Sequence, residues 1–547
     1  MYESGSMRPK ADERQPRPKR WPGLANGLWG AGLTPYAGHN KKPPSSAGGP
    51  IPAQQEPRRG VMRLASLLGP ETTAPPQCGD AEIAGITADS RKVGPGWLFA
   101  AIAGAKADGA RFVPEALAKG AAAILVKAGT PAAVPDGVAV LTAAEPRHAL
   151  ALMASRFYPA QPATIVAVTG TSGKTSVAEF TRQVFAALGR RAASLGTIGL
   201  VKPDGGVYGA LTTPDPVTLH ATLAELAAEG ITHLAFEASS HGLDQHRLDG
   251  VRLKAAAFTN LGRDHLDYHP SPEAYLLAKL RLFSVLLPAD GIAVVNADAE
   301  HAPHVIAAAQ KSGRSVMTVG RAGDALQLAA LDRDGFAQRL RIGFAGRGYD
   351  VRLPLLGDYQ ASNALLAAGL AMAAGEAADR VLPALEKLQG VKGRLEVVGQ
   401  VRGALIVIDY AHKPDALAAA LEALRGVARG RIVVVLGCGG DRDKGKRPIM
   451  GRIAADHAHH VIVTDDNPRS EKPEAIRAEI LAGAPGAREI GDRADAIHAG
   501  MRLLNRGDVL LIAGKGHETG QIVGATVLPF SDHEAVRIAL SEATLDV

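Results

Sequence analysis

A short apolar run that passes directly into a glycine-rich loop with a lysine constrains this chain more than any other feature. The segment reads Val166-Ala-Val-Thr-Gly-Thr-Ser-Gly-Lys-Thr-Ser176, and a helix-like stretch over residues 177–188 follows it. Backbone N–H groups of such a loop can surround phosphate oxygens, and the lysine can reach the outer phosphates of a nucleotide. The order of strand, loop and helix therefore predicts a domain that binds ATP.

The loop is a variant of the general phosphate-binding pattern, because Val168 stands where that pattern has its first glycine. A glycine-rich turn with a coincidental lysine is the alternative interpretation. The hydroxyl of Thr175 or Ser176 is a candidate ligand of Mg²⁺. The candidate ATP-binding residues of the loop are Gly170, Thr171, Ser172, Gly173, Lys174, Thr175 and Ser176.

Apolar strands alternate with helix-like segments along most of the chain, which is typical of α/β proteins. At ~150 residues per domain, a length of 547 residues predicts about three or four domains. Hydrophobic residues make up 46% of the chain and aromatic residues only 4%, a balance that favours small-residue helices on Val- and Ile-rich strands. We predict a small N-terminal α/β domain over residues 62–160, a central doubly wound P-loop ATPase domain over residues 161–394, and a C-terminal Rossmann-like α/β domain over residues 395–547.

Residues 1–61 have a different composition, rich in Pro, Gly and basic residues. They hold ten of the 61 basic and four of the 55 acidic residues, so the rest of the chain has 51 of each and is neutral. A neutral folded part implies no nucleic-acid partner. We expect a disordered basic tail, with an interaction arm or a mistaken start codon as alternatives. The sequence that begins at Met62 favours the mistaken start.

Cysteine content and hydropathy indicate the cellular compartment of the chain. The sequence contains only Cys78 and Cys438, too few for a disulfide framework. No apolar segment approaches the ~18 residues of a membrane span, and the first residues contain no signal-peptide core. We therefore expect a cytoplasmic monomer with no membrane partner.

Four apolar runs in the last third of the chain each pass into a polar loop. The runs cover residues 404–408, 432–436, 461–463 and 509–512. Because the carboxyl ends of parallel strands lie at one edge of a sheet, we expect the four loops to form a single substrate site.

Two residues in the middle of the chain are candidate metal ligands. Glu237 ends a predicted strand, a suitable place for a carboxylate that holds Mg²⁺ against the γ-phosphate. His265 lies in a polar loop and is either a second ligand or a hydrogen-bonded structural group.

Six ordered motifs resemble those of the Mur ligase family. They are Thr169-Gly-Thr-Ser-Gly-Lys-Thr175, Leu211-Thr-Thr-Pro214, Glu237-Ala-Ser-Ser-His-Gly-Leu243, Arg263-Asp-His-Leu-Asp-Tyr-His269, Asp409-Tyr-Ala-His-Lys-Pro-Asp-Ala-Leu417 and Gly440-Asp-Arg-Asp-Lys-Gly-Lys-Arg-Pro448. The resemblance extends from Met62 to Val547 and excludes the tail. It implies an ATP-dependent amide ligase that builds the stem peptide of peptidoglycan.

The reaction that this resemblance implies has two steps. The D-glutamate γ-carboxylate of UDP-MurNAc-L-Ala-D-Glu attacks the γ-phosphate of ATP, with Mg²⁺ present, which gives an acyl phosphate and ADP. The amine of meso-diaminopimelate then attacks the acyl carbon and displaces phosphate. The implied catalytic residues are Lys174, Glu237, His265 and Lys279, and the implied metal ligands are Thr175, Glu237, His265 and Lys279 as a CO₂-derived carbamate. From the residues alone, Lys279 would be a solvated helix residue.

The resemblance also implies contacts to the two other substrates. Ser90 is assigned to the uridine-side pocket of the N-terminal, UDP-binding domain, where Ala105-Lys106-Ala107 departs from the His-Gln-Ala of many relatives. The implied contacts to the muramoyl peptide are Thr212, Thr213, Ser239, Gln245 and Arg247. The implied contacts on the adenosine side of ATP are Asn363, Asp409 and His412, although Asn363 is equally an N-cap of a helix over residues 364–373.

The motif Asp466-Asn467-Pro468-Arg469 resembles the selectivity motif of the diaminopimelate-adding members of the family. A guanidinium matches the distal carboxylate by which meso-diaminopimelate differs from lysine. Without the family this motif would be an ordinary turn. By the same resemblance, Arg442, Gly514 and Glu518 complete the amino-acid pocket.

Three other functions remain as alternatives. A lysine-adding ligase of the same family is disfavoured by Arg469, and a ligase similar to folylpolyglutamate synthetase is disfavoured by the full N-terminal unit. A P-loop ATPase without ligation would leave Arg442, Arg469 and Glu518 without a purpose.

Overall fold

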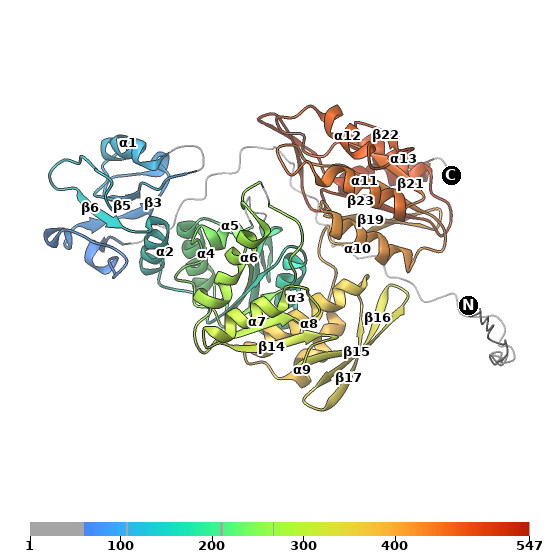
Figure 1. Ribbon diagram of the computed structural model, residues 1–547, viewed down its shortest axis with the longest axis horizontal. Helices are drawn as coiled ribbons and strands as arrows, with labels where there is room; N and C mark the ends of the chain where they lie inside the picture. Colours follow the sequence, from blue (N-terminus) through green and yellow to red (C-terminus); the bar gives the residue numbers. More distant parts are fainter. Residues whose placement is uncertain (1–59, 105–107, 208–211, 266, 546–547) are drawn as a thin grey trace, which may run out of the picture. The chain divides into compact units, whose positions relative to one another are not determined.

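The computed structural model describes residues 60–104, 108–207, 212–265 and 267–545. The predicted tail, apart from its last two residues, and the segment 105–107 of the predicted uridine pocket lie outside these ranges. In the described residues the strands form five sheets, which are coloured along the chain in Figure 1. The α/β fold class predicted from the sequence is confirmed by the helices and the predominantly parallel sheets.

The first large sheet has four parallel strands in sequence order. They are β3 (Gly85–Thr87), β4 (Trp97–Ala100), β5 (Ala123–Lys127) and β6 (Ala139–Ala143), and the associated helices are α1 (Val113–Ala118) and α2 (Pro146–Phe157). A separate pair joins β1 (Met62–Arg63) to β2 (Glu82–Ile83). Alternate residues of β5 lie in two different hydrophobic clusters, so both faces of this small sheet are covered.

The central sheet has eleven strands in the order β10-β9-β8-β11-β7-β12-β13-β14-β15-β16-β17. The strands are β7 (Thr164–Thr169), β8 (Ala192–Gly196), β9 (Gly199–Lys202), β10 (Gly205–Val207), β11 (His233–Glu237), β12 (Ala255–Phe258), β13 (Ile292–Asn296), β14 (Ser315–Gly320), β15 (Leu326–Asp334), β16 (Ala337–Phe344) and β17 (Arg347–Leu353). Neighbours from β8 to β15 pair in parallel, whereas both edges are antiparallel. The long β15–β17 ribbon (Figure 1) was not predicted from the sequence.

Helices cover both faces of this sheet, which is the doubly wound arrangement predicted. The helices are α3 (Lys174–Ala187), α4 (Pro216–Ala228), α5 (Ser240–Asp244), α6 (Pro272–Arg281), α7 (Ala302–Lys311), α8 (Asp358–Ala373) and α9 (Ala378–Ala384). In β7, Val166 and Val168 pack with α3 and α8, whereas Ile165 and Ala167 pack with α4 and α7. This alternation follows from the two-residue period of a strand.

The last large sheet has six strands in the order β18-β19-β23-β20-β21-β22. The strands are β18 (Glu396–Val401), β19 (Ala404–Asp409), β20 (Ile432–Leu436), β21 (His460–Val463), β22 (Arg488–Glu489) and β23 (Val509–Ala513). The helices are α10 (Pro414–Arg425), α11 (Lys446–His457), α12 (Pro473–Leu481), α13 (Arg493–Arg502) and α14 (Asp532–Leu545), and β24 (Gly520–Val523) forms a hairpin with β25 (Thr526–Pro529). The four strands predicted as parallel, β19, β23, β20 and β21, are parallel neighbours.

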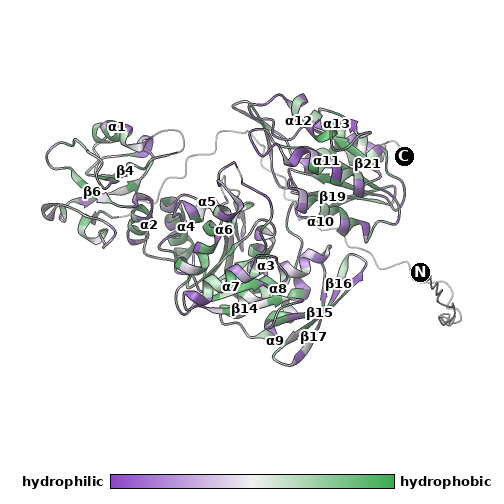
Figure 2. Ribbon diagram, in the orientation of Figure 1, coloured by the Kyte–Doolittle hydropathy of each residue, from purple (hydrophilic) through white to green (hydrophobic). Residues whose placement is uncertain are grey.

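The helices carry hydrophobic and hydrophilic residues on the same element (Figure 2), as expected where one face covers a sheet and the other meets water. Apolar side chains of β20 alternate between two clusters, since Val434 and Leu436 lie in one and Val433 and Val435 in the other. The polar loops after these strands therefore lie at one edge of a sheet whose two faces are both buried.

Candidate active site

The phosphate loop joins β7 to α3 and can be built only with glycines at two positions. Gly170 has φ 147° and Gly173 has φ 86°. A Cβ atom at Gly170 would lie 1.8 Å from the Thr259 hydroxyl oxygen, and one at Gly173 would lie 2.5 Å from the Asn363 side-chain oxygen. The end of β12 approaches the loop closely, so glycine is required there for space as well as for backbone conformation.

Lys174 begins α3, three residues earlier than predicted from the sequence. Its ammonium donates to the carbonyl oxygens of Gly170, at 3.0 Å, and Thr171, at 3.2 Å. Burial and the nearby Lys413 ammonium lower the pKa of Lys174 to about 8. The lysine is therefore held over the loop, in a region that already carries positive charge.

A cavity of about 530 Å³ opens beside the loop. Many residues predicted from the sequence line it: Thr171, Ser172, Gly173, Lys174, Thr175, Ser176, Thr212, Glu237, Ser239, His265, Asn363, Asp409 and His412. These residues come from distant parts of the chain, and the cavity brings them together at the end of the central sheet.

Glu237, the last residue of β11, is a buried carboxylate whose orientation is fixed by one neighbour. Thr197 donates to it twice, from its backbone N–H to Oε1 at 2.7 Å and from its hydroxyl to Oε2 at 3.1 Å. Glu237 also lines the cavity together with Thr175. The oxygen donors of these two side chains fit a hard cation such as Mg²⁺.

His265 lies at the cavity with φ 53°, a left-handed conformation that is uncommon for a residue other than glycine. Its Nε2 atom is 3.1 Å from Asp264, and burial lowers the pKa of His265 to about 3. A neutral imidazole retains a lone pair for a metal ion. The neutral His265 side chain could thus act either as a second metal ligand or as a hydrogen-bonded structural group.

Lys279 is not the solvated helix residue that the residues alone would suggest. Its exposure on α6 is 1%, and its Nζ atom donates to the Gly170 carbonyl at 2.9 Å and lies 4.3 Å from the centre of the Tyr275 ring. Burial, with Lys174 and Lys413 nearby, holds the pKa of Lys279 well below its ordinary value. The side chain therefore lies directly behind the phosphate loop.

Asn363, which also lines the cavity, is not an N-cap, because α8 begins at Asp358. The N-cap alternative is wrong, and the Asn363 amide instead donates to Gln360 at 2.8 Å inside the helix. Burial raises the pKa of Asp409, at the end of β19, to about 6. His412 follows it, and its Nδ1 atom lies 2.7 Å from the Tyr410 carbonyl oxygen.

Two cationic residues of the cavity were not singled out in the sequence. Arg394 donates to the Thr175 hydroxyl at 3.0 Å, and its guanidinium lies 4.3 Å from the Tyr410 ring centre. Lys413 is buried, pairs with Asp264 at 2.7 Å and donates to the Thr171 carbonyl at 3.0 Å. Lys413 stands within a recognised motif, whereas Arg394 lay at a predicted domain boundary and carried no signal.

The residues predicted to contact the muramoyl peptide form a hydrogen-bonded group next to Glu237. The Thr213 hydroxyl donates to the Glu237 carbonyl at 2.9 Å and accepts from the Ser239 N–H at 3.1 Å. Arg247 donates to the Thr213 carbonyl at 2.7 Å and to the Gln245 side chain. Ser90 is not part of this group, since its hydroxyl donates to Glu115 at 3.0 Å.

The residues predicted to bind an amino acid lie on the loops after β20, β21 and β23. The Asn467 amide donates to Glu518 at 3.0 Å, and the Arg469 guanidinium donates to the Gly440 carbonyl at 2.9 Å. Burial and the charge of Arg442 lower the pKa of Arg469. Lys515, fully buried and not predicted, donates to Asn467 and Glu518, both at 3.2 Å.

Pro468 lies between Asn467 and Arg469 in the loop after β21. In the loop after β23, Gly514 has φ 119°. A Cβ atom at Gly514 would lie 2.7 Å from an Asp466 carboxylate oxygen. The backbone therefore approaches Asp466 at a distance that only glycine permits.

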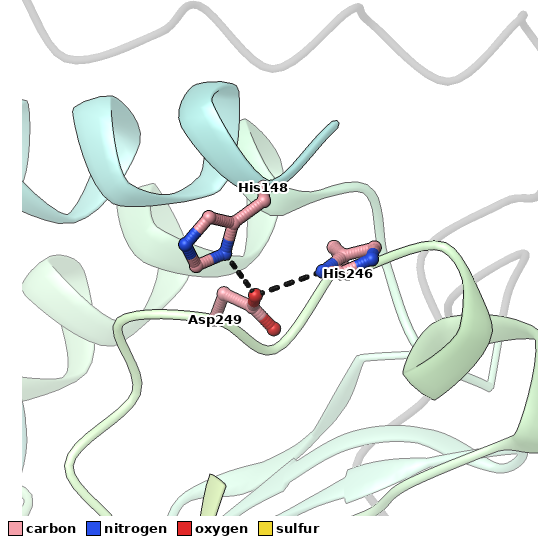
Figure 3. Close-up of side chains that lie close together, drawn as sticks. All are labelled: His148, His246 and Asp249. Carbon is pink, nitrogen blue, oxygen red and sulfur yellow. Dashed lines mark hydrogen bonds and ion pairs between the residues drawn. The ribbon is translucent and has the colours of Figure 1, made fainter. Parts of the chain in front are cut away.

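A separate cluster of His148, His246 and Asp249 was also not predicted (Figure 3). The Nδ1 atoms of the histidines lie 2.5 and 3.0 Å from the same Asp249 oxygen. The three side chains are close enough for a metal ion, but Arg281 donates to both Asp249 oxygens at 2.7 Å and occupies the carboxylate. Burial alone would raise the pKa of Asp249, yet hydrogen bonds from His246 and Arg281 hold it below its ordinary value. The cluster is an ion-pair network that joins α2 to the segment between α5 and β12 and to the end of α6.

None of the helices in the described part of the chain combines the length and the apolar character required to cross a membrane. Cys78 and Cys438 are both free thiols.

Comparisons with known proteins match most of the chain. Three sequence families align in order: "Mur ligase family, catalytic domain" with residues 82–158, "Mur ligase middle domain" with residues 168–371, and "Mur ligase, glutamate ligase domain" with residues 393–516.

Full-length relatives agree with these matches. The chain is 60% identical over 486 residues to a UDP-N-acetylmuramoyl-L-alanyl-D-glutamate–2,6-diaminopimelate ligase of Bradyrhizobium diazoefficiens, which covers 88% of this chain and 99% of the relative. A ligase of the same name from Rhizobium meliloti is 58% identical with the same coverage. A solved structure of a ligase of that name is 34% identical, with a TM-score of 0.62 over 86% of this chain and 96% of the other.

Proposed function

This chain belongs to the Mur ligase family, and from that premise we propose that it joins meso-diaminopimelate to the D-glutamate γ-carboxylate of UDP-MurNAc-L-Ala-D-Glu with ATP. It is an ATP-dependent ligase that forms a C–N bond in the synthesis of a peptidoglycan precursor. The relatives of 58% to 60% identity, which carry the name of this activity, support the assignment.

The observation that carries the proposal is the composition of the cavity beside the phosphate loop. Lys174 and Thr175 line one side, and Thr212 and Ser239, assigned to the muramoyl peptide, line another. A terminal phosphate at the loop and a carboxylate at Thr212 would share this space. Holding both reactants in one geometry is a large part of catalysis of a two-substrate reaction.

Two anions have to approach each other in the first step, so positive charge is needed between them. Lys174, Arg394 and Lys413 supply it at the cavity. Thr175, Glu237 and His265 would hold Mg²⁺, which, when bound, supplies charge neutralisation at the β- and γ-phosphates. The chain's own cations thus stabilise charge on the transferred phosphoryl group and the attacking carboxylate.

We include a carbamate on Lys279 in the proposal. A neutral amine is the form that adds CO₂, and the buried position of Lys279, close to Lys174, disfavours its ammonium form. The carbamate would turn a repulsive cation into an anionic oxygen ligand of Mg²⁺ beside the phosphate loop.

In the second step the amine donor must lie with its distal carboxylate at a cation. Arg469 is the candidate for that contact, with Arg442 nearby, and Glu518 is suited to an ammonium group. A lysine-adding ligase would leave the partly buried Arg469 guanidinium without a carboxylate partner on the substrate, which disfavours that alternative.

The predicted domain limits 62–160, 161–394 and 395–547 remain our proposal for the UDP-binding, ATP-binding and amino-acid-binding parts. We also propose that the enzyme is cytoplasmic, as its use of ATP and its two free cysteines support, and that it acts as a monomer.

A phosphate-release assay with a panel of amino acids tests the function. With the purified chain, ATP and Mg²⁺, we expect release only when UDP-MurNAc-L-Ala-D-Glu and meso-diaminopimelate are both present, and much less with L-lysine. Release that needs neither substrate would support the P-loop ATPase, and equal rates with lysine would support the lysine-adding ligase.

A further inference from the structure

The loops that carry Arg442 and Arg469 both contain a strained backbone position. The first follows β20 and the second follows β21, and Asp441 and Arg469 each have φ 53°. Residues other than glycine adopt this left-handed conformation only where their surroundings hold them in it. The contacts that hold these two loops therefore decide where both guanidinium groups lie.

The two loops are bonded to each other along their backbones. The Gly440 N–H donates to the Asn467 carbonyl and the Arg469 guanidinium donates to the Gly440 carbonyl, both at 2.9 Å. The Ser470 hydroxyl donates to Asp441 at 2.6 Å. A Cβ atom at Gly440 would lie 1.9 Å from the Pro468 carbonyl oxygen. The backbones are thus in direct contact, so a shift of one loop moves the other.

One ion pair, between a buried arginine and a partly exposed glutamate, holds the two loops together. Arg447, in the first turn of α11, has an exposure of 0% and donates to both carboxylate oxygens of Glu471, at 3.0 and 2.9 Å, and to the Gly439 carbonyl at 3.1 Å. Glu471 in turn accepts the N–H of the strained Asp441 at 2.6 Å. Arg447 therefore binds the loop after β20 at Gly439 and the loop after β21 at Glu471. Glu471 in turn connects its own loop to Asp441 in the first one.

Arg447 and Glu471 both stay charged across the physiological pH range. The hydrogen bonds from Arg447 are the main cause that lowers the pKa of Glu471 to about 2. Lys444 lies 3.2 Å from the same carboxylate, and Glu479 of α12 accepts a hydrogen bond from Arg447 at 2.9 Å. An open cavity of about 390 Å³ is lined by Glu471, Asp441 and Arg442, so Glu471, but not Arg447, borders space that a ligand can enter.

We propose that Arg447 and Glu471 are positioning residues that set the separation of Arg442 and Arg469, and thereby the preference for an amine donor with a distal carboxylate. The inference rests on the proposed function and extends it. A guanidinium distinguishes one amine substrate from another only when two of its N–H groups form parallel hydrogen bonds to the substrate carboxylate. A displacement of about one ångström removes much of that selectivity. Neither Arg447 nor Glu471 touches the substrate in this scheme.

The test compares Glu471→Gln with Glu479→Gln. Each change neutralises one partner of Arg447, but only Glu471 also holds the Asp441 N–H. We expect Glu471→Gln to raise the KM for diaminopimelate by at least about tenfold and to narrow the ratio of kcat/KM between diaminopimelate and lysine, with the KM for ATP changed by less than about twofold. Glu479→Gln is expected to leave all three values near those of the unaltered enzyme.

Equal effects of the two variants, or equal changes in the KM values for ATP and diaminopimelate, would overturn the inference. Thermal unfolding of each variant is measured in parallel. If Glu471→Gln does not fold, Ser470→Ala decides, since it removes an exposed contact between the same loops: a selective rise in the KM for diaminopimelate supports the inference, and an unchanged KM overturns it. An unaltered enzyme with no diaminopimelate-dependent phosphate release would overturn the proposed function instead.

Discussion

Lys279 is a residue whose buried position indicates a functional role that sequence spacing alone does not indicate. It lies behind the phosphate loop with its amine on the Gly170 carbonyl. The family resemblance selected it, whereas a single lysine in a helix-like segment has no distinguishing pattern. Arg394 and Lys413 show the same limit, because their burial and their contacts to Thr175 and Asp264 depend on elements far apart in the chain.

Replacing Lys279 with alanine is predicted to lower kcat by about 10²- to 10³-fold, the usual scale for one lost electrostatic contact at a reacting group. Lys311→Ala, on the exposed side of α7, is the matched control and should change kcat little. Steady-state phosphate release measures both. Full activity of Lys279→Ala would remove the carbamate from the account.

Replacing Arg469 with alanine is predicted to raise the KM for diaminopimelate far more than the KM for ATP. Loss of a charged partner in a partly buried pocket costs ~2 to 5 kcal/mol, or roughly 30- to several-thousand-fold in discrimination. Initial rates against each substrate provide the comparison. A proportional rise in both KM values would argue against a role in selectivity.

At the level of helices and strands, periodicity was sufficient where an element is buried on both faces. The runs that became β19, β20, β21 and β23 were recognised because parallel strands covered by helices are continuously apolar. The ribbon β15–β17 was not recognised, since its exposed, charged residues break the apolar pattern. The start of α8 was placed too late because Asp358 and Gln360 do not look like the first turn of a buried helix.

Helix α4 contains a histidine that should make stability depend on pH. His220 has an exposure of 0%, its Nε2 atom lies 2.9 Å from the Asp249 carbonyl oxygen, and burial lowers its pKa to about 4. Between that value and the ordinary one, the unfolded chain binds a proton that the folded chain does not. The contribution is therefore complete above pH ~6.5 and is lost as pH falls toward ~4, by roughly 3 kcal/mol in all.

The variant His220→Gln keeps an N–H donor but does not titrate. We predict a smaller fall in its thermal midpoint than in that of the unaltered chain between pH about 7.5 and about 5. Differential scanning calorimetry at the two pH values gives the comparison. Identical falls for both proteins would show that His220 is not responsible.

For the whole molecule, the order of domains and the α/β class followed from the sequence, because they depend on local patterns repeated many times. The polar loops could be assigned to one site only by assuming parallel strands. Contacts between residues of different segments, such as Arg447 with Glu471, could not be predicted from the sequence, since the motif that contains Arg447 does not indicate which side chain it meets.

Removal of residues 1–61 is predicted to leave kcat and the KM values for ATP and diaminopimelate unchanged. Every residue assigned to the site lies between Ser90 and Glu518. Purified full-length and shortened chains compared in the same phosphate-release assay provide the measurement. A large loss of activity in the shortened chain would make the basic segment part of the enzyme.

The central claim is that the terminal phosphoryl group of ATP passes to the substrate carboxylate before the amide bond forms. It can be followed with UDP-MurNAc-L-Ala-D-Glu labelled with ¹⁸O in the D-glutamate γ-carboxylate. The account predicts that each turnover with diaminopimelate transfers one labelled oxygen to the released phosphate, detected by mass spectrometry. Amide product accompanied by unlabelled phosphate would contradict it.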